Sequence, residues 1–330
     1  MMAPSRRLMT SVALLLVAIL LLAVWSLRSG AVTLDFTQVF NALLGSAPRN
    51  LSLVVTEWRL PRVAMAILVG AALGVSGAIF QSLMRNPLGS PDVMGLNTGA
   101  WSGVLVAMVL FGQHLTAITF TAMAGGMLTS LLIWLLAWRN GIDTFRLIII
   151  GIGVRAMLMA FNTWLLLQAS LETALSAGLW YAGSLNGLTW GKTWPAAPLI
   201  MLMFIAALLL VRRMRLLEMG DDSACALGVG VERSRLMLML VAVLLTAAAT
   251  AIAGPISFIA LVAPHIARRL SGTARWGLTQ AALCGAVLLL AADLCARQLF
   301  MPYQLPVGVV TVSLGGIYLI VLLVQESRKK

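Results

Sequence analysis

The chain has 330 residues, of which 61% are hydrophobic and 10% are charged. Soluble globular domains carry roughly 45–50% apolar and about 25% charged residues, so this composition excludes a soluble protein and indicates a membrane protein. The formal net charge of +12 does not indicate nucleic-acid binding, because the basic residues lie between apolar runs, where they set orientation across a membrane.

Nine apolar runs are the predicted transmembrane elements. A hydrocarbon core of about 30 Å takes about 20 helical residues to cross, and lipid offers unpaired backbone groups no partner. In chain order the uncharged or nearly uncharged runs cover 8–27, 63–84, 96–113, 115–138, 147–168, 193–211, 236–264, 276–296 and 298–325. We therefore predict an all-α polytopic membrane protein with a single transmembrane domain over residues 1–330.

The first run follows Arg6 and Arg7, as in a secretory signal peptide, but no A-x-A cleavage site follows it in VWSLRSG. We expect an uncleaved helix with a cytoplasmic N-terminus. The basic residues 328–330 place the C-terminus on the same side, so the number of crossings must be even. Run 236–264, which has arginines beyond both ends and a break at Gly254-Pro255, is predicted to be a helix hairpin that brings the count to ten. With ten spans, sixteen Lys and Arg residues lie inside and six outside.

Ten spans divide into two sets of five, and two sets of five crossings have opposite orientations. This parity fits the inverted five-helix repeat of many transporters. Two segments punctuated by Gly and Pro, GSPDVMG (89–95) and AGPISF (253–258), fall at corresponding places after the second and seventh spans.

The stretch NGLTWGKT (186–193) ends in the Gly-Lys-Thr of a phosphate-binding loop. Such a loop needs four residues between its first Gly and the Gly-Lys-Thr, whereas three separate Gly187 from Gly191, and no strand precedes them. The segment is also predicted to lie outside, among aromatic residues typical of a membrane interface. We therefore expect no cofactor on this chain, and any ATP hydrolysis to belong to another chain.

The remaining polar residues do not form a catalytic or metal-binding set. His114 and His265 lie in separate segments, and Cys225, Cys284 and Cys295 have no metal-site spacing. The chain is therefore not predicted to be an enzyme.

Two ionisable side chains lie inside apolar runs, where charge is costly. Asp293 precedes Arg297 by four residues, so the two are predicted to form a structural ion pair on one helix face. Arg155, in the fifth span, has no acidic neighbour at helical spacing. It either faces the bundle interior or a transport pathway, or reaches the interface or a backbone carbonyl.

The longest internal polar stretch covers residues 212–235 and is predicted to be cytoplasmic. Asp221 or Asp222 is expected to cap a short helix through Ala224 to Leu227, which Gly228 ends. A simple connection needs fewer residues, so the stretch is predicted to contact a soluble partner.

Five blocks carry a family resemblance: TEWRLPRV (56–63), GAALGVSGAIFQSLMRNPLGSPDVMG (70–95), LEMGDDSACALGVGVERSR (217–235), GPISFIALVAPHIARRLSG (254–272) and LPVGVVTVSLGGIYLIVLL (305–323). They resemble the FecCD-type permease subunits of ABC importers for iron siderophores, haem and vitamin B12. NTGAWSGVLVAMVLFGQ, AWRNGIDTFRLIIIGIG and RWGLTQAALCGA are closer still to the permeases for ferric enterobactin.

The resemblance implies a ten-span, vitamin B12 importer-like (type II) permease in the bacterial inner membrane. It implies four partner chains: a homologous second permease subunit, two copies of a cytoplasmic ATPase and a periplasmic siderophore-binding protein. It assigns residues 212–235 to ATPase coupling, with the candidates Asp221, Asp222, Ala226, Leu227 and Gly228. It places docking arginines at Arg59, Arg62 and Arg297, and the pathway along the fifth and tenth spans. Our own candidates on the fifth span are Arg155 and Asn162. Arg155 itself is not part of the family pattern.

Other functions stay open at this point. A permease for another siderophore, haem or cobalamin would have the same architecture. A secondary transporter driven by ions would place coupling carboxylates or histidines in the membrane, and only Asp293 is available. An intramembrane enzyme would need a nucleophile and base or a metal set.

Overall fold

The computed structural model describes residues 6–30, 32–92, 95–112, 114–138, 144–194, 196–272, 277–299, 301 and 303–327. The basic C-terminal residues 328–330 lie outside this part. The first half contains α1 (Arg6–Arg28), α2 (Phe36–Leu43), α3 (Arg49–Leu53), the π-helical segment η1 (Val54–Arg59), α4 (Leu60–Met84), α5 (Leu96–Leu110), α6 (Leu115–Ala137) and α7 (Thr144–Gln168). The second half contains α8 (Leu171–Tyr181), α9 (Trp190–Thr193), α10 (Ala197–Leu217), α11 (Asp221–Ala226), α12 (Val231–Ala253), α13 (Ile259–Ser271), α14 (Leu278–Gln298) and α15 (Val307–Ser327).

Seven helical segments of the described chain are long and apolar enough to cross a membrane: α1, the continuous segment Arg49–Met84, α6, α7, α10, α12 and α14. Helix α5 and residues 307–321 of α15 are apolar but shorter. Helix α13 has only 13 residues and carries Arg268 and Arg269 in its last turn. The predicted class, a helical polytopic membrane protein, is confirmed, whereas the number of crossings stays a prediction.

The predicted hairpin over 236–264 has different bounds in the structure. Helix α12 continues unbroken to Ala253 and ends at Gly254, whose φ of 69° is open to glycine at little cost. The second helix starts only at Ile259 and runs through the charged residues to Ser271. It packs mainly against α14 and α4, whereas α12 packs against α4, α10 and α6. The hydropathy pattern missed this because half of α13 lies beyond the apolar run.

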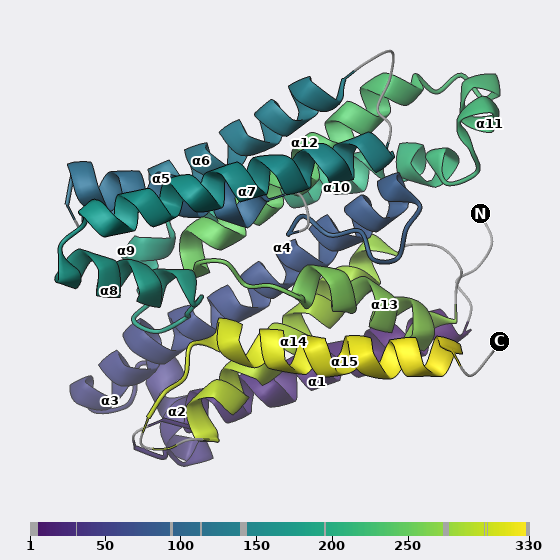
Figure 1. Ribbon diagram of the computed structural model, residues 1–330. Helices are drawn as coiled ribbons and strands as arrows, with labels where there is room; N and C mark the ends of the chain where they lie inside the picture. The colour runs from purple at the N-terminus through teal and green to yellow at the C-terminus, as the bar shows by residue number, and fades with distance from the viewer. Residues whose placement is uncertain are drawn as a thin grey trace.

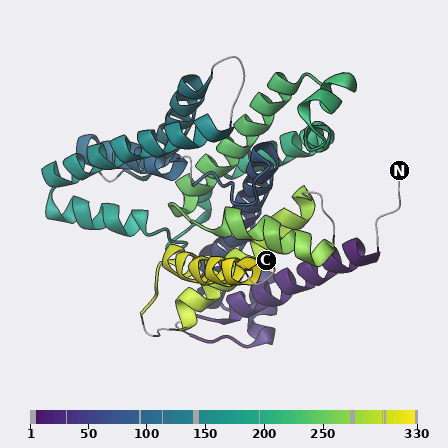
Figure 2. The ribbon, with the colours of Figure 1, turned by 45° about the vertical axis from the view of Figure 1, so that its right-hand side comes forward.

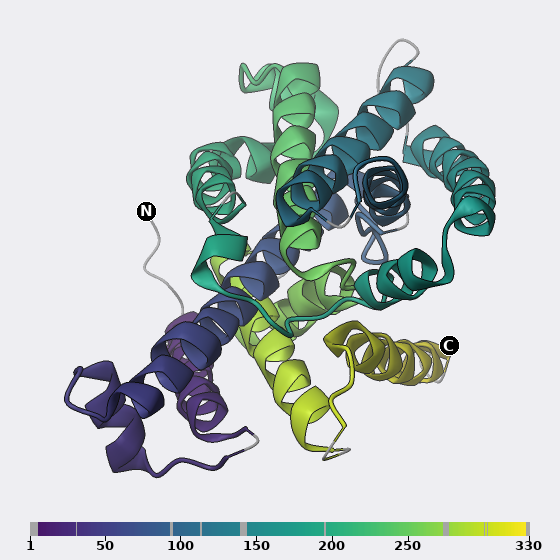
Figure 3. The same ribbon diagram turned by 90° about the vertical axis from the view of Figure 1, so that its left-hand side faces the viewer.

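Helices α4 and α12 form the buried centre, and α4 contacts α12, α13 and α14 (Figure 3). Helices α4 and α14 approach closely, because a Cβ atom added to Gly70 would clash with the carbonyl oxygen of Gly285. Small residues allow two backbones to touch in this way, which replaces the hydrophobic driving force that is missing between helices in lipid. The two helices are therefore fixed relative to one another by their backbones.

The two ends of the bundle differ. The start of α1, the end of α15 and the short helix α11 lie at one end (Figures 1 and 2). Helices α2, α3, α8 and α9 lie at the other end, where they cover the tips of the long helices (Figure 1). We call these the inner and outer ends.

Candidate functional site

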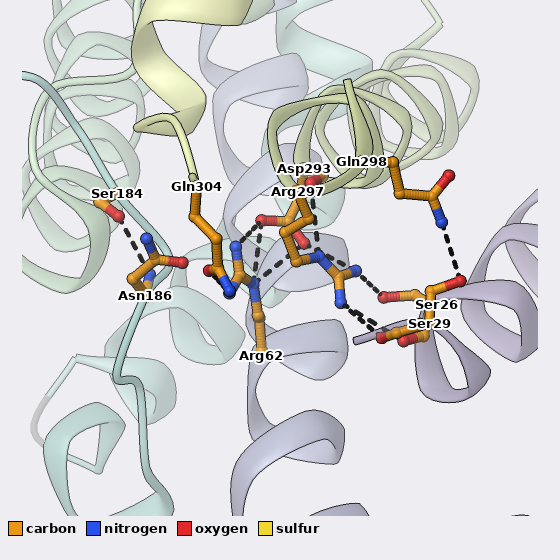
Figure 4. A network of polar contacts seen from close by, with 9 residues as sticks. All are labelled: Ser26, Ser29, Arg62, Ser184, Asn186, Asp293, Arg297, Gln298 and Gln304. Carbon is orange, nitrogen blue, oxygen red and sulfur yellow. Dashed lines mark hydrogen bonds and ion pairs between the residues drawn. The ribbon is translucent and has the colours of Figure 1, made fainter. Parts of the chain in front are cut away.

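At the outer end, a single carboxylate joins two arginines (Figure 4). The side chain of Asp293, on α14, is fully buried, and its Oδ1 lies 2.8 Å from Nη2 of Arg62 on α4. The Nε of Arg62 donates to both carboxylate oxygens, at 3.0 and 3.1 Å. Nη2 of Arg297 lies 3.1 Å from Oδ2 of Asp293, so the predicted Asp293–Arg297 pair is present. Arg62 is the member that the sequence did not reveal, because it lies 231 residues away.

Arg297 also ties this cluster to the end of α1 (Figure 4). Its guanidinium donates to the carbonyl and the hydroxyl of Ser26 and, at 3.3 Å, to the carbonyl of Ser29. On the other side, Arg62 donates to Oε1 of Gln304 at 3.4 Å. Helices α1, α4 and α14 and the segment before α15 are thus joined by one polar network.

Arg59 is held differently from the way the sequence predicted. Its side chain is buried and donates to three backbone carbonyls, those of Leu27, Arg28 and Val32, at 2.7, 2.9 and 2.6 Å. Arg59 is the last residue of the π-helical segment η1, which immediately precedes α4.

The expected outward-facing set of three arginines is therefore corrected in its geometry. Arg59, Arg62 and Arg297 are largely buried and engaged within the chain. They nevertheless line one cavity of about 660 Å³, whose wall also includes Asn50, Trp58, Thr189 and Gln304. The three arginines thus line a cavity and do not form the protruding basic surface that the sequence predicted.

At the inner end, Asp221 is an ion-pair residue and not the helix cap that the sequence predicted. The residue before α11 is Gly220, with a φ of 109° and no side chain to cap with. The carboxylate of Asp221 lies 2.6 Å from Nη2 of Arg85, at the end of α4, and 2.8 Å from Nη2 of Arg235, on α12. It joins α11 to two core helices.

The end of α11 agrees with the predicted stop at Gly228, which has a φ of 77°. The N–H of Gly228 donates to the carbonyl of Cys225, and the N–H of Val229 donates to that of Ala224. This pair of bonds is the Schellman motif, which needs a left-handed residue at the position of Gly228. The candidate residues Asp222, Ala226, Leu227 and Gly228 are exposed. The stretch 212–235 is less of a loop than predicted, because α10 extends to Leu217 and α12 begins at Val231.

In the middle of the molecule, the two Gly/Pro-punctuated segments meet. The carboxylate of Asp92, before α5, accepts hydrogen bonds from the backbone N–H of Phe258, before α13, and from Nδ2 of Asn97, on α5. Asn97 in turn accepts from the hydroxyl of Thr250, on α12, at 3.1 Å. The positive charge of Arg155 also acts on this carboxylate.

A cavity of about 630 Å³ opens at this meeting point. Its wall includes Asp92, Asn97, Arg155, Tyr181, Phe258, Val312 and Ser313, so α5, α7, α8 and α15 all contribute. Arg155 therefore lines a cavity, which agrees with one of the two positions predicted for it. Its acidic neighbour, Asp92, lies on another segment. Asn162 does not line this cavity: it is buried, and its Nδ2 lies 3.4 Å from the carbonyl of Thr98 on α5.

The Gly-Lys-Thr segment, which resembled a phosphate-binding loop in sequence, makes its polar contact within the same segment. The ammonium group of Lys192 donates to the carbonyl of Gly187 at 2.8 Å, and residues 190–193 form the short helix α9 at the outer end. Among the described residues, no group of three or more His, Cys, Asp and Glu side chains is placed to hold a metal ion.

The chain matches the FecCD transport family over residues 15–325. It is 82% identical over 326 residues to the ferric enterobactin transport system permease protein FepG of Escherichia coli (strain K12), a match that covers 99% of each chain. It is 39% identical to the achromobactin transport system permease protein CbrC of Dickeya dadantii (strain 3937), over 96% of this chain and 91% of that one. Among solved structures it is similar to a metal-chelate type ABC transporter in an inward-facing conformation, with a TM-score of 0.78, 27% identity and coverage of 95% and 98% of the two chains.

Proposed function

The chain belongs to the FecCD transport family, and from that premise we propose that it is the translocation subunit of an ABC importer that carries ferric enterobactin across the bacterial inner membrane. The observation that carries the proposal is the 82% identity to the ferric enterobactin permease over 99% of both chains. The subunit itself is not an enzyme and binds no cofactor, and a partner ATPase hydrolyses the ATP.

The proposed topology has ten crossings, with both termini in the cytoplasm. Helices α5, α13 and α15 add three to the seven long apolar segments, which makes ten. The type II importer fold with an inverted five-helix repeat accounts for the corresponding positions of segments 89–95 and 253–258, one in each half. In such repeats, broken helices meet at the site through which the substrate passes.

The proposed assembly contains a homologous second permease subunit, two copies of a cytoplasmic ATPase and a periplasmic siderophore-binding protein. The exposed end of α11, from Ala226 to Gly228, is proposed to contact the ATPase. At the outer end, the cavity lined by Arg59, Arg62 and Arg297 is proposed to receive acidic side chains of the binding protein. A basic concavity suits such a partner because buried charge-assisted bonds to arginine are directional.

Arg155 is proposed to line the pathway and to favour an anionic cargo, since the ferric tris-catecholate complex is an anion. A guanidinium inside a membrane protein is stable where it faces a cavity, as this one does. Conduction requires that attraction be weak enough to let the cargo leave. Asn162 is proposed to support this site indirectly, by joining α7 to α5.

Complementation tests the proposal. The chain is expressed in a strain that lacks its own ferric enterobactin permease subunit, and uptake of ⁵⁵Fe-enterobactin is measured. We expect uptake to be restored, and to be lost when the partner ATPase carries an inactivating substitution. Uptake that persists without an active ATPase would identify an ion-driven transporter instead, and uptake of haem but not of ferric enterobactin would identify a different cargo.

A further inference from the structure

Asp92 stands where an anionic cargo would bind. Its carboxylate accepts from the backbone N–H of Phe258, the residue that precedes α13. A helix N-terminus attracts negative charge through its unpaired N–H groups and its dipole. The same carboxylate feels the positive charge of Arg155, and both side chains line the central cavity. The carboxylate of Asp92 thus lies next to the same positive groups, Arg155 and the start of α13, that would attract an anionic cargo.

The position of this carboxylate is fixed. Phe258 has a φ of 71°, a left-handed conformation that is strained for a residue other than glycine. Its ring lies directly against α15, where a Cβ atom added to Gly315 would clash with it. On the other side, Asn97 donates to Asp92 and is itself held by Thr250. Asp92 therefore cannot withdraw from the cavity without the loss of its hydrogen bonds to Phe258 and Asn97.

The balance of charge in the cavity follows from its lining. Among the described residues that line it, the charged ones are Asp92 and Arg155, one of each sign. With the carboxylate ionised, the empty cavity carries no net charge from its wall. Arg155 is already attracted to Asp92 when an anion arrives. The net attraction of the anion to Arg155 is therefore reduced by the attraction between Arg155 and Asp92.

We infer that Asp92 is the internal counter-ion of Arg155, which competes with the anionic ferric complex for the same positive groups and limits how tightly the cavity holds it. This inference rests on the proposed function, because it assumes that the cavity lies on the route of the cargo. Asp92 is a positioning residue on this account: it touches the wall of the site and acts on the cargo through Arg155.

A double-mutant cycle on the assembled transporter tests the inference. The variants are Asp92→Asn, Arg155→Gln and the double variant, and the control is Glu172→Gln, which removes an exposed carboxylate on α8. Two quantities are measured in proteoliposomes: the ⁵⁵Fe-enterobactin retained per transporter without ATP, and the uptake rate with ATP. Asp92→Ser, which removes the same charge, replaces Asp92→Asn if that variant does not assemble.

We expect Asp92→Asn to raise retention about tenfold, which corresponds to about 1.4 kcal/mol, and to slow uptake. In the Arg155→Gln background the same change should alter retention by less than about twofold, because the attraction it released is gone. The control should behave like the wild type.

Two outcomes separate the inference from its premise. If Arg155→Gln alone leaves retention and uptake unchanged, the proposed pathway through this cavity fails. If Arg155→Gln lowers both, but Asp92→Asn has the same effect in the two backgrounds or none on retention, the pathway stands. In that case Asp92 only supports the start of α13, and the counter-ion inference is overturned.

Discussion

At the scale of single residues, the outer end depends on one carboxylate. Asp293 is fully buried and is shared by Arg62 and Arg297. Burying three charged groups is costly, and the cost is offset only while each keeps its partner. Removing the shared carboxylate therefore has a larger effect than removing the other hydrogen bonds of either arginine.

We predict that Asp293→Asn lowers the free energy of unfolding by about 3–5 kcal/mol, because it leaves two buried guanidinium groups without a counter-charge. The measurement is chemical or thermal unfolding of the detergent-purified protein, together with its abundance in the membrane. Asp35→Asn is the matched control: Asp35 caps α2 at the surface, and Asn caps a helix as well as Asp does. Equal stability of the two variants would contradict the prediction.

At the scale of elements, α11 owes its shape to two glycines and one ion-paired aspartate. Gly220 and Gly228 both have positive φ, and no atom lies within 4 Å of a Cβ added to either. The strain of a substitution at Gly228 would therefore come from the backbone alone. Because Asp221 binds Arg85 and Arg235, a change in the path of this short helix is transmitted to α4 and α12.

We predict that Gly228→Thr strains the end of α11 by roughly 1–2 kcal/mol, since a β-branched residue there must adopt a left-handed conformation. ATP hydrolysis coupled to transport should fall while membrane insertion persists. Gly230→Thr is the control, since Gly230 has an extended conformation with open space around it. If both variants couple normally, the conformation at Gly228 has no part in contact with the ATPase.

At the scale of the whole molecule, the start of α1, the end of α15 and α11 share one end of the bundle (Figure 1). The positive-inside rule predicts that this end is cytoplasmic. The cysteines provide a native probe, because Cys225 on α11 is exposed, Cys284 is buried and Cys295 is intermediate.

We predict that a membrane-impermeant maleimide labels Cys225 in inverted vesicles and not in intact spheroplasts, and that the bound ATPase protects it. The opposite control is Asn186→Cys in a Cys225→Ser background, which adds an exposed thiol at the outer end and should be labelled in spheroplasts. Labelling of Cys225 from the outside would reverse the proposed orientation.

Hydropathy predicted the long helices well because it identifies stretches apolar enough to lie in a membrane. It misplaced their ends because a helix can continue through polar residues beyond its apolar part. The sixth run was expected to end at residue 211, yet α10 continues to Leu217 through three arginines that are helical beyond the apolar part. Helix α8 was not predicted, although Ser170, whose hydroxyl accepts from the N–H of Thr173, is a recognisable helix start.

The candidate sites were predictable only where the partners are close in sequence. Asp293 and Arg297 lie one helical turn apart, so their pair could be read from spacing. The contacts of Arg62 with Asp293 and of Asp92 with Phe258 join residues more than 150 positions apart, and a single sequence carries no record of such contacts. The repeat of small residues at Gly70 and Gly74 was a readable sign of close helix packing.

Helix α4 is anchored by a charge near each of its ends: Arg62 on Asp293 and Arg85 on Asp221. The 23 residues from one arginine to the other correspond to about 35 Å of helix, and each residue turns the chain by about 100°. A single inserted or deleted residue between them would swing one arginine more than a quarter-turn away from its carboxylate. The number of residues between the two arginines is thus fixed by the directions in which they must point around the helix. A relative that keeps both carboxylate partners must also keep this spacing of 23, whatever the thickness of its membrane.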